Sequence, residues 1–431
     1  MDPILVGIIG ILFLFVLLAC GLDVGTSLGI IGFLGFWILV GKNAAFSRMA
    51  ITPFETIADY SLAVLPLFLL MANIIFNAGF GNDAYRVASR WIGHLPGGLA
   101  MATVAGCAGF AAMSASSLGT AITMGLIAFP EMEKYHYKKS LSAGALASGG
   151  TIGILIPPSG MLILYGVLTE TSIGKLFIGG IIPGILEAVF YIITIYIICL
   201  INPSLGPRGP KYSLKEKFTA LMDCGEIVGL VILVLGGLII GWFTPTEAGA
   251  VGAAGALLFS VIRKRLNWKC FKNAIHETIK TTGMLYAVMI GAYIFQYLIS
   301  VSNIPVALSS FVKGLTLPPL GVMGIILLIY IVLGCFMDAM TMIILTIPIF
   351  LPVAIASGFG PIWFGIIVVR VMEMALITPP LGMIVYTISS MFNVPVPKVF
   401  KGVVPFIIAD ICHILLLLLV PGVVLWLPGI M

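Results

Sequence analysis

Two short polar segments interrupt long apolar stretches and carry the side chains with the clearest chemistry. Gly109–Thr120 holds three serines and a threonine within seven residues, and Gly334–Thr341 holds Asp338, an acid in an otherwise apolar block. Hydroxyl and carboxylate oxygens are the donors that hard cations prefer, and hydroxyls also bind carboxylates. We therefore interpret both segments as candidate ion or ligand sites.

Each polar segment also has a purely structural interpretation. Serines are frequent where membrane helices pack closely, and Asp is favoured as the N-cap of a helix that follows a turn. We favour function for the serines because they face a broken helix. An ionisable residue in an apolar membrane segment is costly and usually functional, so Asp338 can act as a cap and as a ligand at once.

A Pro-Pro pair follows each polar segment, in closely similar sequence. Ile156–Met161 reads IPPSGM, and Thr378–Met383 reads TPPLGM. The sequence separation from Ile156 to Thr378, the repeat offset, is about half the chain. Proline removes an amide donor and breaks a helix, which at membrane depth is tolerated where protein, water or an ion satisfies the freed carbonyls. Two matching breaks, one per half, are typical of a transporter with a binding site at the bilayer midplane.

The residues before each break complete the candidate site. Gly149–Ile154 precede the first break, and Arg370, Glu373 and Thr378 precede the second. Arg370 and Glu373 are three residues apart, so they share a helix face and can pair; alternatively, Arg370 binds a substrate carboxylate. Unwound carbonyls and half-helix C-termini suit Na⁺, whereas half-helix N-termini suit a carboxylate.

The chain contains no motif for ATP handling or hydrolysis. Gly-Lys occurs at 41–42 and 174–175, without the following Ser or Thr or the spaced glycine of a phosphate loop. HExxH and GxSxG are absent, and the seven cysteines and four histidines are scattered without metal-ligand spacing. We therefore expect no enzyme and no cofactor apart from a coupling ion, with energy from an ion gradient or a partner.

Composition places the chain in a membrane. Sixty per cent of its residues are hydrophobic, 9% are charged and the mean hydropathy is +1.18, whereas soluble domains carry about 25% charge. Met1–Pro3 has no basic region, and no small-residue cleavage site follows. We predict an all-α polytopic membrane protein whose first span is residues 4–20.

Hydropathy and helix breakers predict ten spans and two hairpins that do not cross. The spans are 4–20, 25–41, 60–79, 143–166, 173–201, 225–242, 246–262, 281–300, 362–386 and 402–428, and the hairpins are 97–132 and 319–356. This count puts 17 of 22 Lys and Arg residues inside and the N-terminus outside, as the positive-inside rule requires. Hairpins that crossed fully would satisfy the rule equally well.

Five spans and one hairpin per half give the two halves opposite orientations. We predict an inverted repeat of residues 1–205 and 225–431, joined by a cytoplasmic linker at 206–224, with broken helices at 143–166 and 362–386. Segment 83–95 is either an interfacial arm, which its basic and aromatic residues would suit, or an ordinary loop.

The chain resembles the large membrane subunit of a tripartite ATP-independent periplasmic (TRAP) transporter of the C4-dicarboxylate or sialic acid type. The resemblance covers nearly the whole chain and is most specific at Gly109–Met132, Ala147–Gly184, Phe243–Gly249, Gly334–Pro352 and Ile377–Ser390. It implies an elevator-type fold with a scaffold and a mobile transport domain that bears two hairpins. It also implies Na⁺-driven uptake of an organic acid across the cytoplasmic (inner) membrane of a bacterium or archaeon.

The resemblance further implies two partners, a periplasmic substrate-binding protein and a small four-helix membrane subunit. That subunit is expected to be separate, because the first span begins at residue 4. By position, the resemblance implies two Na⁺ sites and a substrate site. The first Na⁺ site would use Ser114, Ser116, Ser117, Gly150 and Gly153, and the second Gly334, Asp338, Thr341 and Thr378. Substrate contacts are expected from Ser116, Thr151, Pro157, Arg370 and Pro379.

Two other functions remain open from the sequence. One is a self-sufficient ion-coupled anion carrier or antiporter of the same architecture without a binding protein, and the other is a channel-like or structural membrane subunit. Asp338 and the paired breaks favour a carrier over a channel. Neighbouring genes for a secreted binding protein and a four-span membrane protein would favour the tripartite system. Thr244–Ala248 has no physical explanation from the sequence, and the substrate is not identified by it.

Overall fold

A computed structural model describes residues 2–111, 116–314 and 317–430, and every regular element in these ranges is a helix. The first half consists of α1 (Pro3–Ala19), α2 (Val24–Val40), α3 (Lys42–Ala58), the 3-10 helix η1 (Tyr60–Ala63), α4 (Val64–Asn77), α5 (Gly81–Ile92), α6 (Gly98–Ala111), α7 (Ser117–Lys134), α8 (Lys139–Thr151), η2 (Ile152–Ile154), α9 (Gly160–Leu168) and α10 (Ile173–Ile201). The rest consists of α11 (Leu214–Asp223), α12 (Gly225–Ile240), α13 (Pro245–Ile262), α14 (Trp268–Val301), α15 (Ile304–Gly314), α16 (Pro319–Gly334), α17 (Ala339–Ala356), α18 (Pro361–Ala375), α19 (Met383–Phe392), α20 (Val396–Leu419) and α21 (Gly422–Leu425). The all-α prediction is confirmed.

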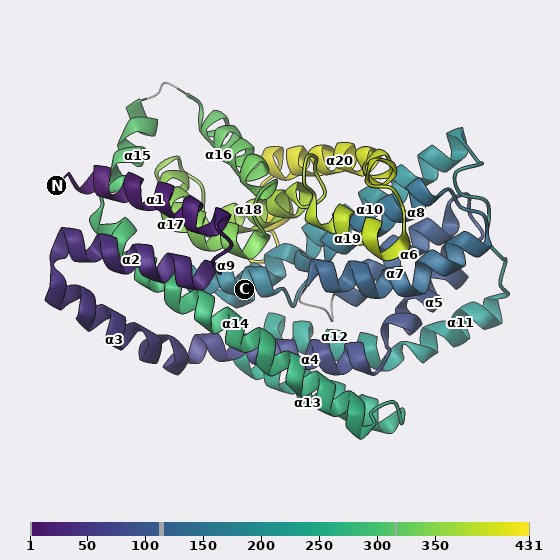
Figure 1. Cartoon of the computed structure of the whole chain (residues 1–431). Coiled ribbons are helices and arrows are strands. Elements are labelled where there is room, and N and C mark those ends of the chain that lie inside the picture. The colour runs from purple at the N-terminus through teal and green to yellow at the C-terminus, as the bar shows by residue number, and fades with distance from the viewer. Residues whose placement is uncertain (1, 112–115, 315–316, 431) are drawn as a thin grey trace.

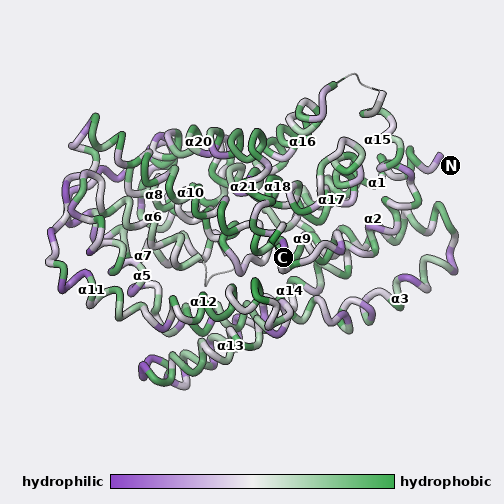
Figure 2. The backbone as a smooth tube through the Cα atoms, turned by 180° about the vertical axis from the view of Figure 1, so that it is seen from behind, coloured by the Kyte–Doolittle hydropathy of each residue, from purple (hydrophilic) through white to green (hydrophobic). Residues whose placement is uncertain are grey.

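Several helices have the length and composition of membrane spans. Among the described residues, six helical stretches of at least 18 residues are apolar enough to cross a bilayer. They are Tyr60–Asn77, Ile173–Ile201, Pro245–Ile262, Trp268–Val301, Ala339–Ala356 and Val396–Leu419. Other apolar helices, including α1, α2, α6 and α16, are shorter. Figure 2 shows hydrophilic residues gathered around α11 and along α3, whereas α16, α17 and α20 are largely hydrophobic.

Three segments differ from the sequence prediction. Residues 42–58, between two predicted spans, form the helix α3. The 34-residue α14 begins at Trp268, well before the predicted span at 281, because the basic residues of its first turns are compatible with a helix and only mask the hydropathy signal. The predicted linker contains a helix of its own, α11.

The linker helix α11 contacts α5. Most of α5 lies in segment 83–95, for which the sequence predicts either an interfacial arm or an ordinary loop. A capping box of Ser213 and Glu216 starts α11, and these hydrogen bonds hold the pKa of Glu216 below its usual range. From α5, Arg90 and Trp91 donate to the carbonyl oxygens of Glu216 and Lys217, at 3.2 and 3.3 Å. Segment 83–95 therefore contains a helix and serves as the docking surface for the linker.

Helix bounds in the two halves recur at the repeat offset. Helices α7 and α17 begin at Ser117 and Ala339, and α8 and α18 begin at Lys139 and Pro361; both pairs are separated by the same offset as the two Pro-Pro pairs. One difference is that α3 and α4 together correspond to the single helix α14. The chain turns between α3 and α4 at Asp59, whose side chain accepts from the Ser61 amide at 2.8 Å. The opposite orientation of the halves stays a prediction.

The two halves interlock instead of forming separate bodies. Helices α2 and α4 pack on α14, and α4 also packs on α13; elsewhere α8 packs on α20 and α9 on α17. Figure 1 shows α3, α4, α13 and α14 along one side of the molecule and α8, α10, α16 and α20 along the other. Glycines allow the closest approach: a Cβ at Gly144 would lie 2.4 Å from the carbonyl oxygen of Gly402. Helices α8 and α20 therefore meet backbone to backbone.

Candidate functional site

The site is a cavity of about 340 Å³ where the two polar segments and the two helix breaks meet. One wall consists of α4 and α14, through residues such as Phe68 and Leu285, and the other of the starts of α7 and α17 with α9 and α19. Most lining side chains are apolar, and the polar ones are Ser116, Ser117, Thr281 and Asp338. An apolar pocket with a few convergent polar groups is the usual form of a small-molecule site.

The polar tips of the two halves hold equivalent positions. Ser116 is the N-cap of α7, and its hydroxyl accepts from the Gly119 amide at 3.1 Å. Asp338, at the repeat offset from Ser116, is the N-cap of α17 and accepts from the amides of Met340 and Thr341. Both caps line the same cavity. The cap interpretation of Asp338 is thus correct, and its place at the cavity leaves it available as a ligand as well.

The first predicted Na⁺ site is compact around the start of α7. Gly150 and Gly153 are buried against this helix: a Cβ at Gly150 would lie 2.6 Å from the Ala121 Cβ, and one at Gly153 would lie 3.0 Å from the Thr120 hydroxyl. Small residues are needed here because α8 and η2 approach α7 so closely. Ser117 lines the cavity beside them, and Ser114 lies outside the described residues.

The second predicted Na⁺ site surrounds the start of α17. The hydroxyl of Thr341 donates a hydrogen bond to Asp338 Oδ1. A Cβ at Gly334 would lie 2.3 Å from the Ala375 Cβ, so this glycine lets the end of α16 contact the end of α18. Thr378 donates from its hydroxyl to the Met374 carbonyl at 2.7 Å, within the turn before the second Pro-Pro pair.

The predicted substrate contacts are not all brought to the cavity. Ser116 lines it, whereas Thr151, Pro157 and Arg370 are buried in the protein, and Pro379 is exposed. The two breaks therefore differ in environment, although both Pro-Pro bonds are cis. At the first break, Pro158 packs near α4 and α12 beside Met71 and Leu230.

Arg370 lies at the centre of a buried polar network. Its side chain is 0% exposed and pairs with Asp410 of α20 and, at 3.4 Å, with Glu187 of α10. His413 Nδ1 accepts from the Arg370 Nε at 3.2 Å. The described ion pairs of Arg370 are thus with these two acids and not with Glu373, and the alternative of a substrate contact stays a prediction.

The network reaches the first helix break through Thr151. The Thr151 hydroxyl lies 3.3 Å from a Glu187 oxygen and 3.3 Å from the Tyr191 hydroxyl. Sequence reasoning missed Glu187, Asp410 and His413. The signal was present, because each lies in an apolar segment where a charge is costly, and the rule that singled out Asp338 applies to them equally.

Glu373 lies on α18 in the second half but is hydrogen-bonded to the start of α7, at the first hairpin. The Ser117 hydroxyl donates to Glu373 Oε2 at 2.7 Å, and Glu373 is 1% exposed.

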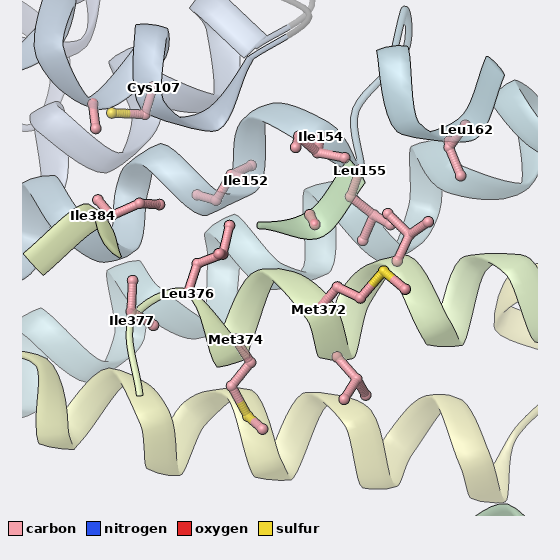
Figure 3. Packing of buried hydrophobic residues seen from close by; sticks show 14 of the residues in the cluster. Cys107, Ile152, Ile154, Leu155, Leu162, Met372, Met374, Leu376, Ile377 and Ile384 are labelled. Carbon is pink, nitrogen blue, oxygen red and sulfur yellow. The ribbon is translucent and has the colours of Figure 1, made fainter. Parts of the chain in front are cut away.

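The two helix breaks also contact each other through apolar side chains. Figure 3 shows Ile152 and Leu155 of the first break close to Leu376 and Met372 of the second half. This packing fixes the backbone around the polar groups.

A family model and several relatives of known name all point to the same protein family. A family model described as "Tripartite ATP-independent periplasmic transporter, DctM component" matches residues 11–423. The chain is 35% identical over 406 residues to the C4-dicarboxylate TRAP transporter large permease protein DctM of Pseudomonas aeruginosa, with 94% of each chain covered. It is 30% identical to the sialic acid TRAP transporter large permease protein SiaM of Vibrio cholerae, with 96% of each covered. It is 31% identical to the ectoine TRAP transporter large permease protein TeaC of Halomonas elongata, with 95% of this chain and 96% of that protein covered.

A solved structure shares the fold. The crystal structure of the YdaH transporter of Alcanivorax borkumensis superposes with a TM-score of 0.56 at 13% sequence identity, and 98% of each chain is covered. At this identity the likeness concerns the fold alone. With the family match over residues 11–423, the chain belongs to the DctM-component family of tripartite ATP-independent periplasmic transporters, which are membrane transport proteins.

Proposed function

We propose that this protein is the membrane subunit through which an organic acid, such as a C4-dicarboxylate or sialic acid, enters the cell together with Na⁺. A periplasmic substrate-binding protein hands over the substrate, and a small four-helix membrane subunit completes the complex. The chain lies in the cytoplasmic membrane with its N-terminus outside, and residues 1–205 and 225–431 form the inverted repeat. The transport domain carries the cavity between the hairpin tips.

The observation that best supports this proposal is the shared cavity. Two hairpin tips and two helix breaks, from distant parts of the sequence, surround one space of about 340 Å³. Broken helices that meet at such a space are the usual construction of ion-coupled transporter sites. Hydroxyl and carboxylate oxygens at its edge, from Ser116, Ser117 and Asp338, suit Na⁺. Two relatives are named as C4-dicarboxylate and sialic acid TRAP transporter permeases, and these names support the proposed substrate class.

The test is uptake into proteoliposomes that contain the complete complex, with the binding protein added outside. Radiolabelled C4-dicarboxylate, sialic acid and ectoine are offered in turn under an inward Na⁺ gradient or in K⁺-only buffer. We expect uptake of an organic acid only with the Na⁺ gradient and the binding protein. Equal uptake in the two buffers would contradict Na⁺ coupling.

The same assay separates the alternative function. A self-sufficient carrier would take up substrate at the same rate without the binding protein. In that case the family resemblance would hold for the fold, but the proposed delivery of substrate by a binding protein would be wrong. Uptake of ectoine alone would leave the mechanism in place and move the substrate away from the classes proposed here.

A further inference from the structure

We propose that Glu373, which lies in the second half of the chain, supplies the negative charge of the cation site at the first hairpin tip. This inference rests on the proposed Na⁺ coupling and adds a residue that the sequence did not assign to either ion site. The partner chemistry is a desolvated monovalent cation held between α7, η2 and α18.

Glu373 is a buried carboxylate with one oxygen free. Its Oε2 accepts a hydrogen bond from the Ser117 hydroxyl at 2.7 Å, and its Oε1 is buried with no hydrogen-bond partner among the described residues. The side chain is 1% exposed, so bulk solvent does not reach it. A buried polar atom without a partner requires an explanation, and a bound ion is one such explanation.

Within the described part of the chain, the cation nearest to Glu373 in sequence forms ion pairs with two other acids. Arg370, three residues before Glu373, forms its described ion pairs with Asp410 and Glu187. These two acids already outnumber the single guanidinium, and burial of a further ionised carboxylate is costly unless a positive charge accompanies it. A bound cation beside Glu373 supplies that charge.

Ser117 connects the carboxylate to the cavity. This residue lines the cavity with Ser116, and its hydroxyl donates its only hydrogen to Glu373. The oxygen lone pairs of Ser117 are therefore available to a cation. An ion beside Ser117 would lie close to the negative charge of Glu373 without direct exposure of that carboxylate to the cavity.

Comparison of the two halves explains why a charge is needed here. The second tip has its own carboxylate, because Asp338 caps α17, whereas the equivalent cap of α7 is the neutral Ser116. At the same repeat offset, Glu373 corresponds to Thr151. Each cation site thus gains one carboxylate: Asp338 from the tip in the second half, and Glu373 from the facing broken helix in the first.

Glu373 is tested by equilibrium binding of ²²Na⁺ to the purified complex in lipid nanodiscs. We expect wild type to bind Na⁺ in two separable sites, and Glu373→Gln, which keeps the shape and the hydrogen bond but removes the charge, to weaken one site by about tenfold or more. Asp338→Asn should weaken the other site, and the double variant should lose both. Glu216→Gln, on the exposed α11, is the matched control for loss of one acidic charge and should bind as wild type does.

A rescue variant separates charge from structure. Ser116→Asp gives the first tip the carboxylate cap of the second, so Glu373→Gln combined with Ser116→Asp should regain most of the Na⁺ affinity. If Glu373→Gln does not fold, Glu373→Asp, which keeps the charge but shortens the side chain, should bind Na⁺ more weakly at one site with unchanged thermal stability in K⁺ buffer.

The outcomes distinguish this inference from the proposed function. Absence of Na⁺ binding to the wild type would overturn the Na⁺ coupling itself. Wild-type binding with an unchanged Glu373→Gln affinity would overturn the inference alone and would mean that Glu373 is held neutral by its surroundings. Failure of Ser116→Asp to restore binding in a folded double variant would likewise count against the charge assignment.

Discussion

At the scale of single residues, the site depends on acids that serve two purposes. Asp338 holds the first turn of α17 through the Met340 and Thr341 amides and also lines the cavity. Arg370, by contrast, is buried inside the protein, where it interacts with Asp410, Glu187 and His413. A charged residue at membrane depth is therefore not by itself a ligand contact. Its neighbours in space decide its role.

Removal of the Asp338 charge tests whether the cap is also a ligand. Asn is about as good an N-cap as Asp, so Asp338→Asn should change the free energy of unfolding by less than about 1 kcal/mol while Na⁺-dependent uptake falls severely. The matched control is Asp23→Asn at the N-cap of α2, where the side chain accepts from the Thr26 amide at 3.2 Å. Wild-type Na⁺ dependence in Asp338→Asn would show that the residue is only a cap.

Gly334 is a second residue whose small size the structure explains. A methyl group there would lie 2.3 Å from the Ala375 Cβ, and neither atom belongs to a flexible side chain. We expect Gly334→Ala to destabilise the protein by about 1–3 kcal/mol and to lower its melting temperature in detergent. Gly324→Ala on the same helix, which meets open space, should be neutral or stabilising. Equal melting temperatures for the two variants would contradict the contact between α16 and α18.

At the scale of elements, each half contributes a helical hairpin followed by a broken helix. In the first half these are α6, α7, α8 and α9, and in the second α16, α17, α18 and α19. The breaks occur where Pro-Pro prevents a continuous helix, and α7 and α17 each begin at a polar cap, Ser116 and Asp338. If the two hairpins have opposite orientations, as the inverted repeat predicts, a cavity that they share can open to alternate sides of the membrane.

Cysteine accessibility tests the opposite orientation of the hairpins. Leu118 and Met340 line the cavity at equivalent positions, separated by the repeat offset. In a background without the native cysteines, Leu118→Cys should react faster with an impermeant thiol reagent from inside, and Met340→Cys faster from outside. Addition of Na⁺ should change the two rates in opposite directions if it shifts the orientation of the carrier. Labelling of both from the same side, unaffected by Na⁺, would contradict the inverted repeat.

At the scale of the whole molecule, the cavity lies between two groups of helices. One wall comes from α4 and α14 and the other from the hairpins and broken helices. The capping box of Thr244 and Glu247 at the start of α13 gives part of the sequence stretch Thr244–Ala248 a structural role in the first of these groups. A transport cycle of the elevator type requires the two groups to slide past each other.

A crosslink between the groups should therefore stop transport. Phe68 of α4 contacts Phe177 of α10, with ring centroids 5.7 Å apart, and α10 packs on α6, α9 and α18 of the second group. We expect a short bifunctional thiol reagent applied to the Phe68→Cys, Phe177→Cys variant to abolish uptake, and cleavage of the crosslink to restore it.

The control joins two elements within the second group, which holds the hairpins and the broken helices. Phe129 of α7 and Phe392 of α19 stack with centroids 4.3 Å apart, and a crosslink between cysteines at these positions should leave uptake largely intact. Undiminished uptake with Phe68 and Phe177 crosslinked, verified by mass spectrometry, would show that α4 and α10 do not move relative to each other during transport.

The class of the protein, the two helix breaks and the two polar tips can all be predicted from the amino-acid sequence. The spans and the breaks are local properties, because apolar runs set membrane spans and Pro-Pro sets the breaks. The repeat offset can be read directly from the sequence. The family could also be recognised, because its motifs are contiguous. The helix α3 and the early start of α14 were missed, since hydropathy reports apolar runs and not amphipathic or basic helices.

The pairing of the buried charges, by contrast, depends on how the helices pack in three dimensions. Arg370, Asp410 and Glu187 lie on three helices, and the link from Ser117 to Glu373 spans 256 residues. No periodicity predicts such partners, because they depend on how helices from the two halves pack at close approaches such as Gly144 on Gly402. The equivalence of Ser116 and Asp338 likewise emerged from helix bounds. The positions of the polar residues along the chain are given by the sequence, whereas their hydrogen-bond and ion-pair partners depend on helix packing.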